Sequence, residues 1–162
     1  MQSLQGHLLV ASPQVSDEDF ARAVILLIQH SDMQAVGVVL NRPGDTPLGN
    51  LLKGADKAAG QCGSCTYWGG PVPGTVMALH TCQSAADLEV LSGVYYSVKK
   101  KSLQQLLARP EHRAKLFDGH AGWGPSQLEQ QIEAGQWQVV PAQEDHVLGT
   151  NHDLWQSVVQ GD

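Results

Sequence analysis

The feature that most restricts the fold is an apolar run at residues 23–28 (AVILLI), which no polar residue interrupts. A β-rich stretch that is apolar on every side is typical of a strand covered on both faces. A polar loop at 31–35 follows it, and a second apolar stretch (VGVVLN) ends before Pro43. Because proline ends a strand ladder, the pattern predicts a hairpin of strands 24–30 and 36–41.

The whole chain contains 17 glycines and 8 prolines, which favours short strands over long helices. One mixed domain over residues 1–162 is predicted, without an internal repeat or an interdomain linker. Further strands are predicted at 6–13, 66–81 (two), 86–98 (one or two), 114–123 and 136–142. Short helices are predicted at 46–54, 102–110 and 125–134 and from 150 onward, with a loop rich in Gly, Ala and Ser at 54–64.

Polar residues at the expected helix starts suggest where those helices begin. Ser16 with Asp19, and Thr150 with Asp153, have the spacing of a capping box. Ser102 is expected to cap the helix that closes before Pro110.

The stretch at 119–129 (GHAGWGPSQLE) reads as the end of a strand followed by a helix. Its glycines Gly119, Gly122 and Gly124 permit close backbone approach or a positive φ. Pro125 suits the first helical position, Glu129 complements the helix dipole, and Gly135 is expected to stop the helix in the left-handed conformation. The start of this helix could also hold an anion. Apolar side chains expected to face the core here are Trp123, Leu128 and Ile132.

The charge and the termini narrow the function classes. The formal net charge is −6, which argues against non-specific binding to nucleic acid or to an anionic membrane. The N-terminus lacks the basic region of a secretory signal, and the longest apolar run is too short to span a bilayer. Three cysteines do not form a disulfide framework and are expected to be reduced. These features predict a cytoplasmic protein.

Common catalytic signatures are missing from the sequence. It has no G-x-x-x-x-G-K-[ST] loop, no G-x-G-x-x-G fingerprint, no G-x-S-x-G elbow and no H-E-x-x-H motif. No cofactor is therefore predicted.

The cysteines allow one weak metal hypothesis. Cys62 and Cys65 have a spacing with which both thiolates can hold one metal ion, and His80 with Cys82 could complete a zinc tetrahedron. However, H-x-C is not the usual second half of such a site, and alternate residues of a strand point to opposite faces. The favoured interpretation is reduced thiols and no metal site.

Three histidines, His30, His80 and His120, fall at or near the ends of predicted strands, where functional groups gather. They could converge on a site with an acidic residue such as Asp32, Asp45 or Asp118. A histidine in such a place is more often a core-edge residue with satisfied hydrogen bonds, and convergence cannot be read from sequence. Asn41 and Arg42 allow two similar interpretations: a turn that ends the strand, or an arginine that binds an anion.

Several motifs together resemble one family. The stretches at 6–43 (from GHLLVASP to VVLNRP), 68–72 (WGGPV), 78–80 (ALH), 92–97 (SGVYYS) and 119–137 occur in the order seen in the bacterial YqgE/AlgH family. The resemblance extends from Gly6 to about Val140. His120 stands where the family often has tyrosine, and Gln131 where it often has a second acid. Cys62 and Cys65 are not part of the family pattern.

The resemblance implies an α+β fold, in which a bifurcated, curved, mostly antiparallel sheet forms a pseudo-barrel flanked by short helices. It implies little biochemistry. Members are often labelled transcriptional regulators, yet this chain has no helix-turn-helix with a basic recognition helix.

Two functional hypotheses follow. The first is a non-enzymatic binding or regulatory protein that acts through an unknown protein or small molecule, by default a monomer. The alternative is a small hydrolase-type enzyme that uses His30, His80 or His120. The predicted binding groove is lined by Asn41, Arg42, Gly69, Gly70, Pro71, His80, His120 and Trp123.

Overall fold

A computed structural model describes residues 4–15, 20–42, 66–107, 114–148 and 154–160. Several sequence predictions lie outside these residues: the capping boxes at 16–19 and 150–153, the helix at 46–54 and the loop at 54–64. Cys62, Cys65 and Asp45 lie outside them too.

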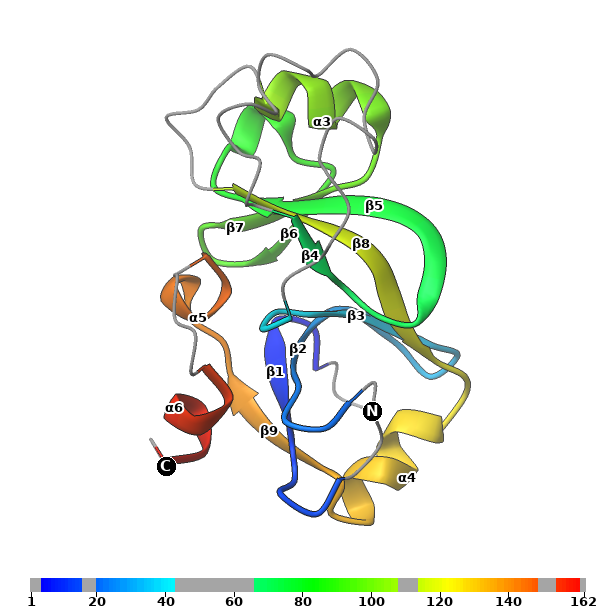
Figure 1. Cartoon of the computed structure of the whole chain (residues 1–162). Helices are drawn as coiled ribbons and strands as arrows, with labels where there is room; N and C mark the ends of the chain where they lie inside the picture. The colour runs from blue at the N-terminus through cyan, green and yellow to red at the C-terminus, as the bar shows by residue number, and fades with distance from the viewer. Residues whose placement is uncertain (1–3, 16–19, 43–65, 108–113, 149–153, 161–162) are drawn as a thin grey trace.

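The described residues form one curled, nine-stranded sheet with short helices around it (Figure 1). The strand order is β6-β7-β5-β8-β3-β2-β1-β9, and β4 pairs with β8 in parallel while the other pairs are antiparallel. This α+β architecture confirms the predicted fold class. The strands are β1 (His7–Ala11), β2 (Val24–His30), β3 (Ala35–Val39), β4 (Thr66–Trp68), β5 (Val72–His80), β6 (Leu88–Leu91), β7 (Val94–Ser97), β8 (Ala114–Trp123) and β9 (Trp137–Pro141).

The predicted hairpin is confirmed: β2 and β3 pair antiparallel, with a register shift between Leu27 and Gln29. Both faces of β2 are buried, as its unbroken apolar run predicts. Val24, Leu26 and Ile28 belong to one core cluster, which we call the first. Ala23, Ile25 and Leu27 belong to another, the second. The strand is therefore the shared wall of two cores.

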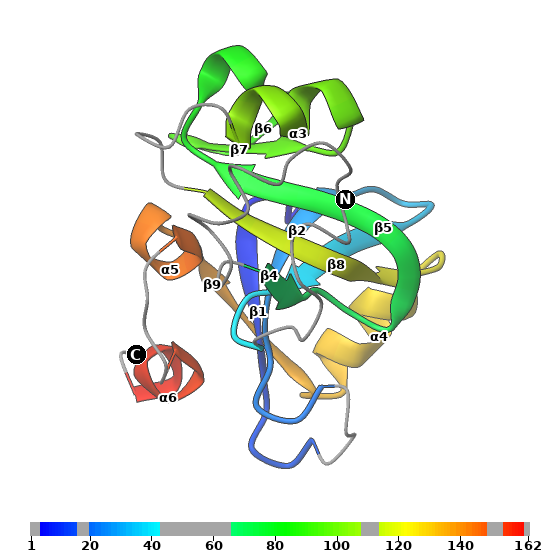
Figure 2. The ribbon, with the colours of Figure 1, turned by 45° about the horizontal axis from the view of Figure 1, so that its top comes forward.

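The sheet divides where β3 and β8 separate. The two strands pair only from Ala35 to Gly37. Beyond that point β4 pairs with β8, and Gly69 joins the separated strands, because its carbonyl accepts the N–H of Val39 and its own N–H donates to Asp118. On the other edge of β8, away from β3, β5 pairs with β8 and bends around it (Figure 2).

Glycines make the close crossing beside β8 possible. A Cβ atom on Gly69 would lie 2.3 Å from the carbonyl oxygen of Gly119, and one on Gly70 would lie 2.2 Å from the carbonyl carbon of His120. Gly119 itself has φ of 85°, a conformation that favours glycine. The chain can therefore pass over β8 only with glycines at 69 and 70.

The described helices are α3 (Lys100–Leu107), α4 (Gln127–Glu133), α5 (Glu144–Leu148), α6 (Leu154–Gln160) and a 3₁₀ turn at Gln83–Ala85. None of them is long and apolar enough to cross a membrane. The helix α5 and the 3₁₀ turn were not predicted. The last helix, which was predicted, buries Leu154 and Val158 in the first cluster, with Trp155 packed beside them.

Two predicted helix starts are wrong. The first is Ser102: α3 begins at Lys100, and the hydroxyl of Ser102 donates to the carboxylate of Asp87. The second is Pro125, because α4 begins only at Gln127 and the preceding Ser126 is left-handed with φ of 63°. The predicted end is confirmed, since Gly135 has φ of 82°.

Candidate functional site

Six of the eight residues of the predicted groove lie around the place where residues 69 and 70 pass over β8. Arg42 accepts the N–H of Trp68 through its carbonyl, and Gly69 and Gly70 lie against the backbone of Gly119 and His120. Pro71 is exposed and precedes Val72, the register partner of His120.

Asn41 and Arg42 serve as backbone ties in this structure. The amide oxygen of Asn41 accepts the N–H of Val24 at 3.0 Å, and its nitrogen donates to the carbonyl of Arg22 at 2.8 Å. The guanidinium of Arg42 donates to the carbonyl of Ala21 at 3.1 Å. It also lies over the ring of Trp68, 5.3 Å from its centroid, so both side chains are engaged by distant backbone and ring contacts and not by a local turn.

His80 and Trp123 lie away from this crossing. His80 is the register partner of Ala114, six positions along β8 from His120, a distance of about 20 Å at the rise of a strand. Trp123 is buried in the second cluster, and its indole N–H donates to Gln131.

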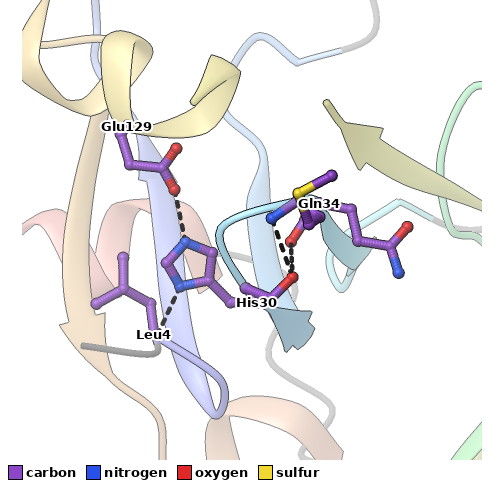
Figure 3. Close-up of polar contacts among 6 residues, drawn as sticks. Leu4, His30, Gln34 and Glu129 are labelled. Carbon is purple, nitrogen blue, oxygen red and sulfur yellow. Dashed lines mark hydrogen bonds and ion pairs between the residues drawn. The ribbon is translucent and has the colours of Figure 1, made fainter. Parts of the chain in front are cut away.

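His30 is held between two segments that are distant in sequence (Figure 3). Its Nδ1 accepts the backbone N–H of Leu4 at 2.8 Å, and its Nε2 lies 2.7 Å from a carboxylate oxygen of Glu129 on α4. An amide can only donate, so Nδ1 carries a lone pair and Nε2 carries the proton that the carboxylate accepts. This hydrogen bond, opposed by partial burial, holds the pKa of Glu129 below its ordinary value.

His80 has the same arrangement, but its side-chain partner is fully buried, unlike Glu129. Its Nδ1 accepts the N–H of Cys82 at 3.0 Å, and its Nε2 lies 2.8 Å from the hydroxyl of Ser97. The ring is fully buried. Because Nδ1 is the acceptor, Nε2 is the donor, and it cannot remove the proton of Ser97. His80 and Ser97 are therefore the residue types of a base and a nucleophile, but their hydrogen bonds are not arranged for that chemistry.

His120 differs from both. Its Nδ1 is buried and has no hydrogen-bond partner in the structure. Since Ala121 and Trp123 belong to the second cluster and strand residues alternate, His120 points to the opposite face. The three strand-end histidines are thus in three separate environments.

The structure describes only part of the weak zinc candidate. Among the described residues, no group of three or more His, Cys, Asp or Glu is placed to hold a metal ion. Both nitrogens of His80 are engaged as described above, and Cys82 is a buried free thiol.

The sequence pattern of the family described as AlgH-like matches residues 8–161. The chain belongs to this AlgH-like family. A UPF0301 protein of Myxococcus xanthus is 38% identical over 166 residues, which cover 99% of this chain and 92% of that protein. A UPF0301 protein of Streptomyces avermitilis is 34% identical over 167 residues, covering 98% and 86%.

Solved structures of similar proteins agree with this assignment. The solution structure of the AlgH protein of Pseudomonas aeruginosa has a TM-score of 0.79 at 26% identity and covers 99% of this chain and 88% of that one. A crystal structure of a Corynebacterium diphtheriae protein has a TM-score of 0.78 at 28% identity, covering 100% and 88%. The resemblance read from the motifs is confirmed.

Sequence reasoning missed several polar contacts of this AlgH-like domain. Glu129 was assigned to the helix dipole, whereas its carboxylate pairs with His30. Gln131 accepts the indole N–H groups of both Trp123 and Trp137, at 3.0 and 2.8 Å. A periodic polar position on the buried side of a helix, as at Gln131 next to Leu128 and Ile132, is the signal that could have indicated the second contact.

Proposed function

We propose that this AlgH-like protein is a non-enzymatic binding or regulatory protein that acts through a protein or small-molecule partner, and not by direct contact with DNA. The observation that carries the proposal is the state of the imidazoles. The nitrogens of His30 and His80 that would act as bases accept backbone N–H groups instead. The net charge of −6 supports the second half of the proposal.

The surface that we propose for the partner is the Val72 surface, made of Val36, Pro71, Val72, His120 and Gly122. Val72 is opposite His120 and Val36 is opposite Gly122, so register and alternation bring these four positions to one face, and Pro71 adjoins Val72 in the chain. Val72 is 41% exposed, and Pro71 and Gly122 are exposed as well. An apolar surface around one imidazole suits recognition of an apolar group with one hydrogen-bonding atom.

The location and assembly are part of the same proposal. A buried free thiol at Cys82 supports a reducing compartment such as the cytoplasm. We propose a monomer as the acting form.

The test is affinity capture from a lysate of the organism that makes the protein, with Val72→Lys as the variant and Val98→Lys as its matched control. Val98 is 38% exposed and lies elsewhere, so both variants add the same charge at a similarly exposed valine. We expect one partner to be lost with Val72→Lys and retained with Val98→Lys. Equal retention by both variants would remove the Val72 surface from the proposal.

A second measurement addresses nucleic acid. We expect the protein to pass through a heparin column at moderate salt. Retention that weakens steeply as salt rises would contradict the proposal, because that is the behaviour of phosphate binding.

A further inference from the structure

The first residues of the described chain form a strap that lies across the sheet. We use this name for residues 4–6. The side chain of Leu4 packs against the second cluster, the N–H of Gly6 donates to the carbonyl of Leu27 at 2.9 Å, and the carbonyl of Leu4 accepts the N–H of His7 at 3.0 Å. Gln5 reaches the carbonyl of Glu89 on the edge strand β6. The strap therefore contacts both β2 and the edge strand β6.

The hydrogen bond from Leu4 to His30 depends on the protonation state of the ring. The neutral ring accepts the N–H of Leu4 at Nδ1 and donates from Nε2 to Glu129. A proton added at Nδ1 turns this acceptor into a donor that faces another donor, so the bond to Leu4 is lost. The same proton gives the ring a positive charge, which the carboxylate of Glu129 stabilises. The contact with Glu129 is thus kept in the form of His30 that cannot hold the strap.

The other titratable groups near the contact between Leu4 and His30 do not replace the hydrogen bond that is lost when His30 is protonated. Asp32 follows in the β2–β3 turn, α4 also carries Glu133, and β3 carries no titratable residue. His7 approaches the other side of the same peptide, with its Nδ1 3.2 Å from the carbonyl of Leu4. A carbonyl requires a donor there, so protonation of His7 leaves that contact in place.

We propose that His30 and Glu129 form a proton-operated latch for the strap: neutral His30 holds Leu4, and protonated His30 releases it. Release uncovers the surface beneath Leu4 and the outer edge of β6. An uncovered strand edge is a template for pairing with another chain, so the latch couples pH to exposure of an interaction surface. This inference is independent of the partner proposed for the Val72 surface.

The experiment is an NMR titration of the full chain from about pH 8 to about pH 5, the range in which imidazoles gain charge. The observables are the ring signals of His30 and the exchange protection of the amides of Leu4 and Gly6, corrected for intrinsic rates. The amide of Ser12, which donates to Gln136, is the internal control. We expect Leu4 protection to fall roughly tenfold as His30 titrates, the change for one lost net hydrogen bond, with Ser12 unchanged.

Two variants separate the latch from general loosening. In His30→Asn the amide oxygen takes the place of Nδ1 and cannot titrate, so Leu4 protection should stay constant with pH. In Glu129→Gln an acceptor for Nε2 remains, so Leu4 protection at neutral pH should match that of the wild-type protein. Leu4 protection that stays constant in the wild-type protein, with or without titration of His30, would overturn the proposal. So would Leu4 protection in His30→Asn that falls with pH as it does in the wild-type protein.

Discussion

His30 and His80 end two strands with the same hydrogen-bond pattern, but in different surroundings. Each ring accepts a backbone N–H at Nδ1 and contacts a side chain through Nε2. The partner of His30 is the carboxylate of Glu129, whose side chain is 33% exposed. The partner of His80 is the hydroxyl of Ser97, which is fully buried. A carboxylate stabilises a charged ring far more than a neutral hydroxyl does, so the two ties share one geometry but differ in the charge of the partner.

The largest predicted effect is a loss of stability when His80, the histidine with the buried partner, is replaced. His80→Ala leaves the N–H of Cys82 and the hydroxyl of Ser97 without this partner in the core, so we expect the free energy of unfolding to fall by about 3 kcal/mol. His30→Ala should lower it by only about 1–2 kcal/mol, because water can reach the freed carboxylate of Glu129. Urea unfolding at neutral pH measures both. Equal losses of unfolding free energy in the two variants would mean that the burial of the side-chain partner does not change how much each histidine contributes.

The next effect concerns how α4 is attached to the sheet. Gln131 accepts the indole N–H groups of Trp123 and Trp137, and both rings are buried. Gln131→Ala should therefore lower the free energy of unfolding by about 2 kcal/mol and change the near-UV circular dichroism of the tryptophans. Gln131→Glu keeps an acceptor and is the matched control. A Glu variant as unstable as the Ala variant would indicate that side-chain volume matters and the shared acceptor does not.

Local patterns were enough to predict much of the sheet, because burial and turns depend on neighbours in sequence. The apolar run of β2 indicated a strand buried on both faces, and Gly135 indicated a left-handed helix end. The pairing of His30 with Glu129 joins residues 99 positions apart. Their contact depends on the curl of the sheet, which no local periodicity of the sequence reveals.

The two wrong helix starts have the same cause. Ser102 has a suitable side chain for a cap, yet α3 starts two residues earlier because Asp87, 15 positions away in sequence, supplies the acceptor. Pro125 suits a first turn, yet the left-handed Ser126 delays α4. In both places, the start of the helix is set by a contact or a backbone angle that the local sequence pattern does not show. Among the predicted groove residues, spacing could not tell that His80 lies at the far end of β8.

A smaller effect is predicted at the start of α3, where the side chain of Asp87 contacts residues just before the helix and in its first turn. The carboxylate of Asp87 accepts the N–H groups of Val98 and Lys99 and the hydroxyl of Ser102. Partial burial acts to raise the pKa of Asp87, but these hydrogen bonds outweigh it and hold the pKa below the ordinary 3.8. The stabilisation is therefore present above pH 3.8 and is lost as the pH falls through the lowered value.

We expect Asp87→Ala to lower the free energy of unfolding by about 1 kcal/mol at neutral pH, as the loss of a helix cap does. Urea unfolding against pH measures this. Ser102→Ala is the control, because it removes one of the three contacts and should cost less. A larger loss with Ser102→Ala would restore Ser102 as the main cap.

The smallest effect belongs to Glu129, and it returns to the contrast between the histidines. The hydrogen bond from His30 lowers the pKa of Glu129 from 4.5, against the opposing effect of burial. Its stabilisation is present above pH 4.5 and is lost as the pH falls through the lowered pKa. Glu129→Gln keeps an acceptor without charge, so at neutral pH we expect a loss well below about 1 kcal/mol, as for exposed ion pairs. Urea unfolding should show the difference between variant and wild type closing below pH 4.5. A difference that persisted in acid would mean that Glu129 acts through its shape and hydrogen bonding alone.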